Sequence, residues 1–379
     1  MPFSLYLHFP FCKNLCSYCD FYKVSHDSFA ESSFYRALAI ETRLAADKLP
    51  LSQREISTIF VGGGTPSMTN LDNFAAWLAL LRNLFIVPEK IEFSFESNPE
   101  SIDLPTLLAL KELGINRPVF GIQSFNTQLL GLLNRKHNPH QSQRAVYYAG
   151  ALGLTNFGVD LIFGLPGQTS RMLSADIDQL VDLDPPHISF YQLTIEQGTP
   201  LAVQIESGKL RLPDSELMLA MYKGGHEQFV SAGYHRYEVS SFAKPGFECR
   251  HNLGYWTGSD YLGLGPSAHS FIDNQRFANK SNLDEYIASL TDNQLPRVVD
   301  QSGPEERITE AIMLGLRTSR GISRSHFSKR FGIPIEAHLD RKQLDLLVKS
   351  GHLLTEDGGL RLSDEGILLA DEITRRLLK

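Results

Sequence analysis

Three of the four cysteines of this chain, Cys12, Cys16 and Cys19, lie within eight residues of one another and follow a short apolar segment. Thiolates gathered this closely are typical metal ligands. A closed zinc site needs a fourth ligand, and a four-iron cluster with every iron bound by protein needs a fourth cysteine. Three thiolates on four irons leave one iron open to a small molecule. The C-x3-C-x2-C spacing therefore predicts a [4Fe–4S] cluster with one open iron.

The same cysteines could instead form a disulfide or remain as buried thiols. A disulfide is disfavoured because the local number of cysteines is odd and no secretory leader precedes them. Three thiols in one loop are also rarely all buried. We therefore expect a metal site.

Composition and charge limit the class of protein. With 379 residues and 42% hydrophobic side chains, the chain can form two or three domains with their own cores. A formal net charge of −7 argues against binding nucleic acid or anionic membrane by bulk electrostatics. No apolar stretch is long enough to cross a bilayer. We expect a cytoplasmic protein, with peripheral contact at the inner membrane face as the alternative.

Short β-rich segments alternate with amphipathic helical patterns. The expected strands are residues 4–9, 56–61, 91–96, 118–122, 157–163 and 187–193. The expected helices are residues 28–47, 71–85, 104–113, 139–152 and 170–183. The strands are apolar on both faces, as buried parallel strands are. Because crossovers are right-handed and helices must cover the outside, the pattern predicts an α/β fold, a partial parallel (β/α)6 barrel.

Polar residues and glycines follow these strands, at the rim where parallel barrels place their sites. The cysteines follow the first strand, and the later strand ends carry Gly63, Gly64, Thr65, Glu96, Gln123, Asp160 and Tyr191. A glycine run lets backbone approach a ligand closely, although a tight turn is the alternative interpretation. Glu96 could accept hydrogen bonds from ribose hydroxyls or be a solvated surface carboxylate.

Several motifs together resemble a known family. They are Tyr6-Leu-His-Phe-Pro-Phe-Cys12, Gly62-Gly-Gly-Thr-Pro66, Glu96-Ser-Asn-Pro-Glu100, Gly121-Ile-Gln-Ser-Phe125, Asn134-Arg-Lys-His137 and Gly158-Val-Asp-Leu-Ile-Phe-Gly-Leu-Pro-Gly-Gln168. Nearly end to end, the chain resembles the oxygen-independent coproporphyrinogen III dehydrogenase-like branch of radical S-adenosylmethionine (SAM) proteins. The resemblance implies that Cys12, Cys16 and Cys19 hold the cluster. It also implies SAM contacts from Tyr6, Gly63, Gly64, Thr65, Glu96, Gln123, Arg135 and Asp160.

Two features depart from the dehydrogenase itself. Phe21 stands where that enzyme has a further cysteine, and only eleven residues precede Cys12, where the enzyme has a long substrate-covering arm. We therefore expect no coproporphyrinogen dehydrogenase activity, although oxidation of a porphyrinogen remains the alternative function.

The segment Cys249-Arg-His251-Asn-Leu-Gly-Tyr-Trp256 resembles the His-Asn-x-x-Tyr-Trp signature of HemW-type haem chaperones. An exposed imidazole beside two large aromatic rings could bind haem iron and cover a porphyrin face, whereas the alternative is a hydrogen-bonded packing residue. With the whole motif present, we predict haem binding at His251. The resemblance implies delivery of haem to apo haem proteins, with respiratory-chain subunits among the candidates.

Beyond the barrel, residues 235–242 and 270–278 are expected to be strands that close one edge of the sheet. We place the first domain at residues 1–292 and the second at 304–379, because prolines and Gly303 cluster between them. The second domain is expected to contain helices 304–316, 323–331 and 334–350, a hairpin at Asp357-Gly358-Gly359, and a last helix from residue 363. Helices plus a hairpin predict a winged helix.

Winged helices often bind DNA, which makes a nucleic-acid-binding regulator the rival hypothesis. A reading helix should be rich in Arg, Lys, Asn or Gln. The candidate helix mixes acidic and basic residues: Glu336, Asp340 and Asp345 with Arg341, Lys342 and Lys349. We therefore expect a protein-contact or substrate-covering module and no nucleic-acid partner.

Overall fold

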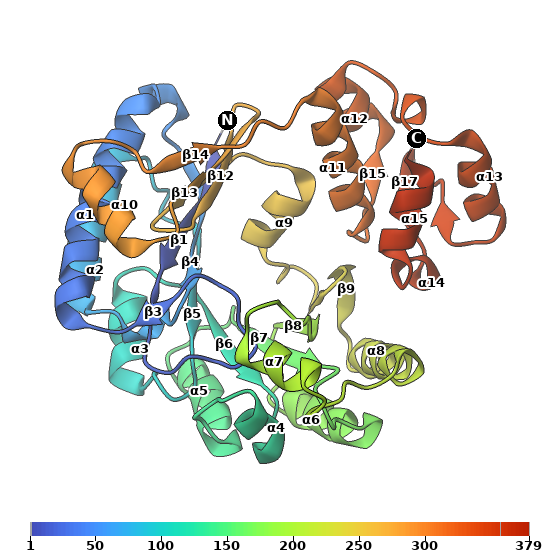
Figure 1. Cartoon of the computed structure of the whole chain (residues 1–379), viewed down its shortest axis with the longest axis horizontal. Coiled ribbons are helices and arrows are strands. Elements are labelled where there is room, and N and C mark those ends of the chain that lie inside the picture. The colour runs from blue at the N-terminus through green and yellow to red at the C-terminus, as the bar shows by residue number, and fades with distance from the viewer. Residues whose placement is uncertain (1, 357, 379) are drawn as a thin grey trace.

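A curved sheet forms the centre of the molecule (Figure 1). The computed structural model describes residues 2–356 and 358–378. Six neighbouring strands are parallel, as predicted: β1 (Phe3–Phe9), β4 (Ile56–Gly63), β5 (Glu92–Ser97), β6 (Arg117–Gln123), β7 (Gly158–Phe163) and β8 (His187–Gln192). Their carboxyl ends share one rim, which confirms the partial barrel and gathers the residues that follow each strand.

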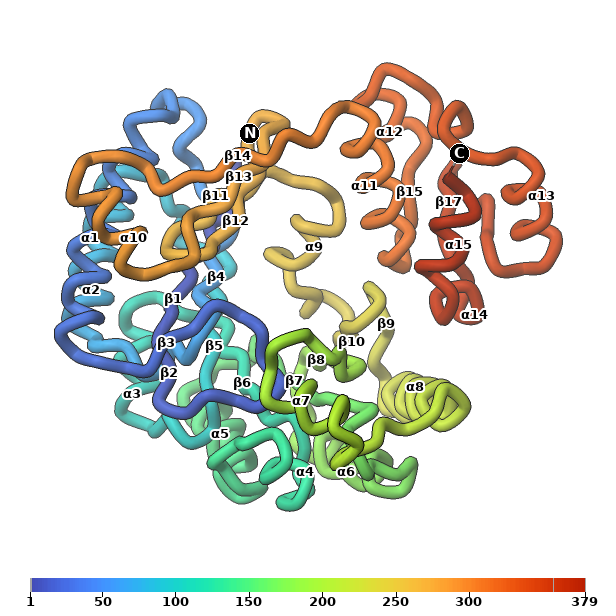
Figure 2. The backbone as a smooth tube through the Cα atoms, in the orientation of Figure 1, coloured from blue at the N-terminus to red at the C-terminus, as the bar shows by residue number. Residues whose placement is uncertain are grey.

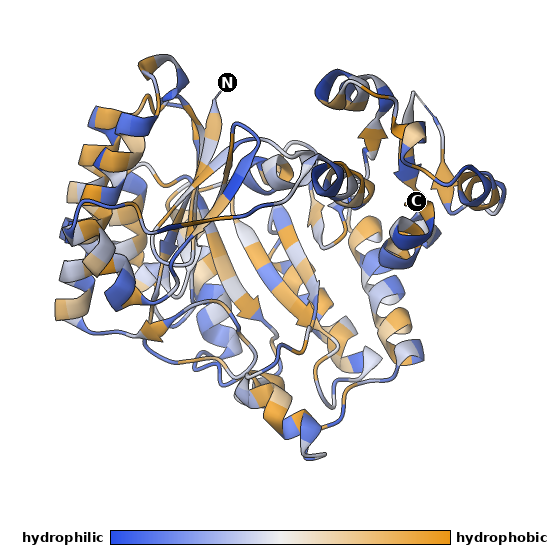
Figure 3. Ribbon diagram, turned by 45° about the horizontal axis from the view of Figure 1, so that its top comes forward, coloured by the Kyte–Doolittle hydropathy of each residue, from blue (hydrophilic) through white to orange (hydrophobic). Residues whose placement is uncertain are grey.

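Helices cover the outer face of the sheet, as Figure 1 shows. They are α1 (Ser28–Lys48), α2 (Leu71–Leu84), α3 (Leu104–Glu112), α4 (Thr127–Leu132), α5 (Pro139–Ala151), α6 (Ser170–Asp182) and α8 (Ser215–Ser231). Helix α7 (Pro200–Glu206) lies instead at the rim, where the Leu201 amide donates to the Ser17 carbonyl of the cysteine loop at 2.9 Å. The predicted helices end within about two residues of the observed bounds because their signals are local. Asp27, for example, accepts from the Ala30 amide and begins α1. Figure 3 shows that hydrophobic residues predominate on the central strands.

The sheet is extended at both edges. Within the described residues it has 12 strands, in the order β14-β13-β12-β11-β1-β4-β5-β6-β7-β8-β10-β9. The added strands are β9 (His235–Glu238), β10 (Ser241–Ala243), β11 (Tyr261–Leu264), β12 (His269–Ile272), β13 (Gln275–Asn279) and β14 (Arg297–Val299). The prediction that residues 235–242 and 270–278 close one edge was wrong, since they lie at opposite edges. The unpredicted β11 separates β12 from β1 and is parallel to β1.

Two further features lie near the barrel opening. The short strands β2 (Phe11–Cys12) and β3 (Val24–Ser25) pair across the base of the cysteine loop. Helix α9 (Arg250–Thr257) packs on β4 and on the first C-terminal helix. On the outer side of the sheet, away from this opening, α10 (Leu283–Thr291) packs on α1. Figure 2 shows α9 inside the arc of the sheet, facing the C-terminal part.

The C-terminal part has the helices and small sheet of a winged helix, as predicted. Its helices are α11 (Pro304–Leu316), α12 (Arg324–Phe331), α13 (Arg341–Lys349), α14 (Asp364–Ile367) and α15 (Ala370–Leu377). Strand β17 (Gly359–Leu362) pairs with β15 (Ile322–Ser323) and with β16 (Leu353–Leu354), forming the expected hairpin, although Asp357 lies outside the described residues.

The single helix predicted at residues 334–350 was wrong. Ile335–Ala337 is one 3-10 turn, and α13 starts afresh at Arg341. Asp340 causes the break, because its side chain accepts from the Gln343 amide and caps the new helix. No helix in the described part of the chain is long and apolar enough to cross a membrane.

Candidate functional site

The cysteine loop lies over the carboxyl ends of the strands. Cys12 is buried, Cys16 and Cys19 are half-buried, and all three are free thiols. The loop is hydrogen-bonded to the end of α4 and the segment after it: the Ser17 hydroxyl donates to the Leu132 carbonyl at 2.9 Å, and the Asn134 side-chain amide donates to the Leu15 carbonyl at 2.7 Å. Residues far apart in the chain thus hold the three thiols over the barrel.

One cavity of about 370 Å³ is lined by all three cysteines and by most of the predicted SAM contacts: Gly63, Gly64, Thr65, Glu96, Gln123, Arg135 and Asp160. This volume is within the range of small-molecule sites, about 300–1,000 Å³. The cavity is also lined by Tyr18, Asn98, Tyr191 and Gln192. Tyr6 and His251 do not line it.

The cysteines do not converge on a single point. Among the described residues, no group of three or more His, Cys, Asp or Glu side chains could hold one metal ion. A four-iron cube places different demands on its ligands, since each cysteine binds a different iron atom.

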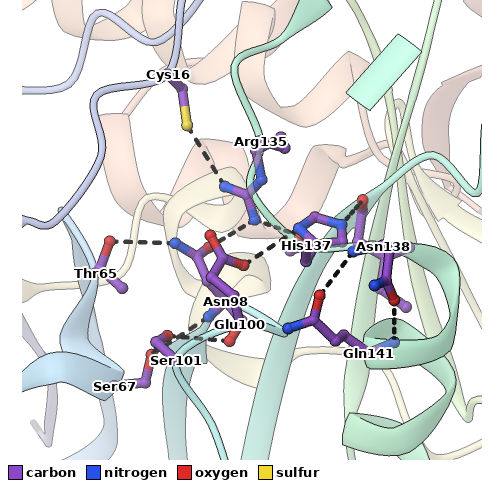
Figure 4. Close-up of polar contacts among 12 residues, drawn as sticks. Cys16, Thr65, Ser67, Asn98, Glu100, Ser101, Arg135, His137, Asn138 and Gln141 are labelled. Atoms are coloured by element: carbon purple, nitrogen blue, oxygen red, sulfur yellow. Dashed lines mark hydrogen bonds and ion pairs between the residues drawn. The ribbon is translucent and has the colours of Figure 1, made fainter. Parts of the chain in front are cut away.

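A polar network joins two of these sulfurs to the barrel, and Figure 4 shows the part of it that contains Cys16. Arg135 donates to the Cys16 sulfur at 3.6 Å, to the Asn98 side-chain oxygen at 2.7 Å and to the Gly121 carbonyl at 2.6 Å. The Thr65 hydroxyl donates to the Cys12 sulfur at 3.4 Å, and the Asn98 amide donates to Thr65 at 3.2 Å. Donors at sulfur suit thiolates that bind metal, because they stabilise negative charge on the sulfur.

Two acidic side chains face the same cavity. Burial raises the pKa of Glu96 to about 8, and the nearby Asp160 adds to that rise. Burial likewise raises the pKa of Asp160 to about 6, against the lowering effect of a Ser189 hydrogen bond. Asp160 Oδ1 and Arg135 Nε are buried without a partner in the described structure. Orphaned polar atoms in a cavity indicate a site built for a polar ligand, and the residues present fit both a cluster and SAM.

The glycine run permits a close approach of β4 to the cysteine loop. Gly63 has a φ of +106°, and a Cβ atom there would lie 2.7 Å from the His8 ring. At Gly64 a Cβ atom would lie 2.6 Å from the Phe11 carbonyl oxygen. The tight turn and the close approach are therefore both present, and only glycine fits at these positions.

Tyr6 lies behind the wall of the cavity and does not line it. Its hydroxyl is hydrogen-bonded to His8 Nδ1 at 3.1 Å, and His8 Nε2 is hydrogen-bonded to the Tyr22 carbonyl at 2.8 Å. Burial lowers the pKa of His8 to about 4, so its ring is neutral at pH 7. The pair orients the end of the cysteine loop.

His251 is buried, which corrects the expectation of an exposed imidazole. The residue is only 1% exposed, and its ring nitrogens are hydrogen-bonded to the Thr58 and Tyr255 hydroxyls, each at 2.8 Å. Burial lowers its pKa to about 3. Glu92 accepts from the Arg250 and His251 amides and so fixes the start of α9. The side of α9 that faces β4 is set by tertiary packing, so the inward position of His251 could not be predicted from the sequence.

The sequence motifs predict no role for Asn98 or Tyr18. Asn98 connects Arg135 to Thr65, and Tyr18 lines the cavity from within the cysteine loop. Asn98 could have been found because it follows the third strand by one residue, at the shared rim. Tyr18 had no comparable signal, since a tyrosine between two cysteines can point either way.

Comparison with known proteins places this architecture in a class. Residues 6–180 match the Radical SAM superfamily, and residues 303–369 match the HemN C-terminal domain. The solved structure of the radical SAM enzyme coproporphyrinogen III oxidase (HemN) from Escherichia coli superposes with a TM-score of 0.85 at 25% identity, over 99% of this chain and 89% of that one. The fold, together with these matches, is that of a radical SAM protein.

Similarity to curated proteins shows which radical SAM family the chain belongs to. The chain is 33% identical to the heme chaperone HemW of Bacillus subtilis over 349 residues, which is 92% of each chain. It is 36% identical to HemW of Mycobacterium tuberculosis over 325 residues, 85% of this chain and 83% of that one. It therefore belongs to the HemW family.

Proposed function

We propose that this chain is a haem chaperone that holds a [4Fe–4S] cluster on Cys12, Cys16 and Cys19, binds SAM beside it, and delivers haem to apo haem proteins. The observation that carries the proposal is the shared cavity, in which three free thiols lie beside Glu96, Asp160 and the polar groups that follow the other strands. Membership of a family whose curated relatives are named heme chaperones supports the haem part.

Within the cavity, each group has a task suited to its chemistry. Glu96 would accept hydrogen bonds from ribose hydroxyls, while Asp160 and Gln123 would hold other polar groups of SAM. Gly63 and Gly64 would let SAM lie against the backbone, and Arg135 would hold the Cys16 sulfur in place. When bound, the cluster would supply one electron and an open iron.

Tyr6 and His251 would act by positioning other groups. Tyr6 would support SAM through His8 and the loop behind it. His251 would keep α9 and Tyr255 in place, and it could ligate haem iron only after the hydrogen bond at the ligating ring nitrogen, to Thr58 or to Tyr255, broke. We place the handover of haem in the cytoplasm, at respiratory-chain subunits among other recipients, with peripheral contact at the inner membrane face.

Anaerobic reconstitution with iron and sulfide tests the cluster. We expect the absorbance and electron paramagnetic resonance of a four-iron cluster in the full chain. Alanine at position 12, 16 or 19 should abolish that signal, whereas Cys249→Ala should keep it, because Cys249 lies outside the cavity. Failure of the unaltered chain to form the cluster, or a signal retained without these cysteines, would overturn the proposal.

Haem transfer is the second test. The reconstituted chain, loaded with haem, should pass it to the apo form of a b-type haem protein, which is followed by the absorbance of the acceptor. Retention of all haem in the presence of excess acceptor would contradict a chaperone.

The resemblance to HemN supports one other candidate, a porphyrinogen-oxidising enzyme. Phe21 is 60% exposed where the dehydrogenase motif has a further cysteine, so the loop differs at a site near the cluster. We expect no loss of coproporphyrinogen III when it is incubated anaerobically with SAM, reductant and the reconstituted chain. Its conversion would favour the enzyme.

A further inference from the structure

A second cavity, of about 420 Å³, lies between α9 and the C-terminal part. Leu253 and Trp256 line it from α9, while Phe327 and Phe331 line it from α12. It shares no lining residue with the cysteine cavity. The cleft thus has the size of a small-molecule site and is separate from the one already described.

The walls of this cleft offer flat apolar surface. Trp256 is half-buried, and its indole has no hydrogen bond or ring contact within the described structure. A tryptophan in a cavity usually finds a partner for both its ring and its N–H group. Trp256 therefore leaves a large aromatic face available to a planar ligand.

Positive charge exceeds negative charge around the cleft. Arg320, Arg330 and Arg361 line it, against the single acidic residue Glu356. Glu356 is paired with Arg361 at 2.9 Å, and Arg330 donates to the Thr257 carbonyl at 3.2 Å. Arg320 is exposed and has no partner among the described residues. The surplus suits a ligand with carboxylate groups, which guanidinium binds through two parallel hydrogen bonds.

His326 adds a possible metal ligand. It lies on α12, is exposed, lines the cleft, and neither of its ring nitrogens has a partner in the part of the chain that the structure describes. It differs in this from His251, whose ring nitrogens are both engaged. A free imidazole is a common ligand of haem iron.

We propose that haem docks in this cleft, with its macrocycle against Trp256, its carboxylates on Arg320 and its iron on His326. The inference rests on the proposed haem-chaperone function and assigns it a site. It also gives the C-terminal part a task, since α12 would supply the iron ligand and α9 the aromatic surface.

Haem titration of the full reconstituted chain, followed by absorbance, tests the site. We expect His326→Ala to weaken haem binding by at least about tenfold and to alter the ligation spectrum, as loss of a metal-supporting group does. Added imidazole should restore the spectrum, which a merely structural role would not allow. Arg320→Glu and Trp256→Ala should each weaken haem binding as well, because they remove contacts on other sides of the ligand.

His140→Ala is the matched control, because His140 is also exposed and lies outside both cavities. Its haem affinity and spectrum should equal those of the unaltered chain. If the unaltered chain binds haem and the three cleft variants bind it equally well, the cleft is not the site, although the chaperone function stands. If the unaltered chain binds no haem at all, both proposals fail. Circular dichroism of each variant separates loss of binding from loss of fold.

Discussion

At the scale of single residues, Arg135 is the group that ties the cysteine loop to the barrel. Its guanidinium contacts a sulfur, an amide oxygen and a backbone carbonyl at once. A guanidinium presents five N–H donors in a rigid planar fork, which suits three acceptors that lie in fixed directions. The ammonium of lysine is a single point of charge on a flexible stem.

Arg135→Lys should therefore keep the charge but lose the geometry. We expect SAM affinity to fall by about tenfold, because the support of the Cys16 sulfur and of Asn98 is lost. Calorimetry on the anaerobic reconstituted protein measures this. Arg144→Lys is the control, since Arg144 lies on α5 outside the cavity. Equal affinities for the Arg135 variant and the unaltered chain would show that the network does not support SAM.

The raised pKa of Glu96 gives SAM binding a pH dependence. Its carboxyl group has a pKa of about 8, so it loses its proton as the pH rises from 7 to 9. The ionised form only accepts hydrogen bonds and attracts the sulfonium, whereas the protonated form also carries a donor. SAM affinity should therefore increase by up to about tenfold over this range. Glu96→Gln should bind more weakly and show no such increase, and an unchanged pH profile in that variant would assign the effect to another group.

At the scale of elements, Glu41 joins α1 to the added edge of the sheet. It is fully buried and accepts from the Gly265 amide at 2.9 Å, the Asn279 amide at 2.5 Å and the Tyr286 hydroxyl at 2.5 Å. These donors belong to β13, α10 and the segment after β11. A buried carboxyl with several donors is costly to remove, because each donor is then left without its acceptor.

Glu41→Ala should lower the free energy of unfolding by about 3 kcal/mol. Urea denaturation measures the loss, and hydrogen exchange should show it first in β11–β13. Glu41→Gln keeps an acceptor oxygen, so its free energy of unfolding should lie between those of Glu41→Ala and the unaltered chain. Glu89→Ala, at an exposed position, should leave stability unchanged. A Glu41→Ala variant as stable as this control would mean that the edge is held by its strand pairing alone.

At the scale of the whole molecule, the barrel and the C-terminal part each have a hydrophobic core. We propose that residues 1–292 and 304–379 are two domains on this basis. They meet through polar contacts: Arg236 pairs with Asp364 at 2.7 Å, and the Ser319 amide donates to the Tyr237 carbonyl at 3.0 Å. Val239, which follows β9, also packs against the C-terminal core, so both polar and apolar contacts join the two parts.

The full chain should not be retained on duplex DNA at moderate salt. Helix α13 carries Arg341, Lys342 and Lys349, but Asp340 and Asp345 offset them, and the formal net charge of the chain is −7. An electrophoretic shift assay measures this, with a known winged-helix DNA-binding protein as the positive control. Salt-dependent retention of the full chain would revive the regulator hypothesis.

The amino-acid sequence alone determined the six parallel strands, the five helices predicted between them, and the rim. Helix caps such as Asp27, apolar runs in the strands and the order of strand and helix are local, so the barrel and the placing of Glu96, Gln123 and Asp160 at strand ends could be predicted. Only the tertiary structure decided which edge each later strand joined. It also decided that Tyr6 stands behind the cavity and that His251 points inward. These outcomes depend on pairing and packing between residues distant in the chain, which no local pattern contains.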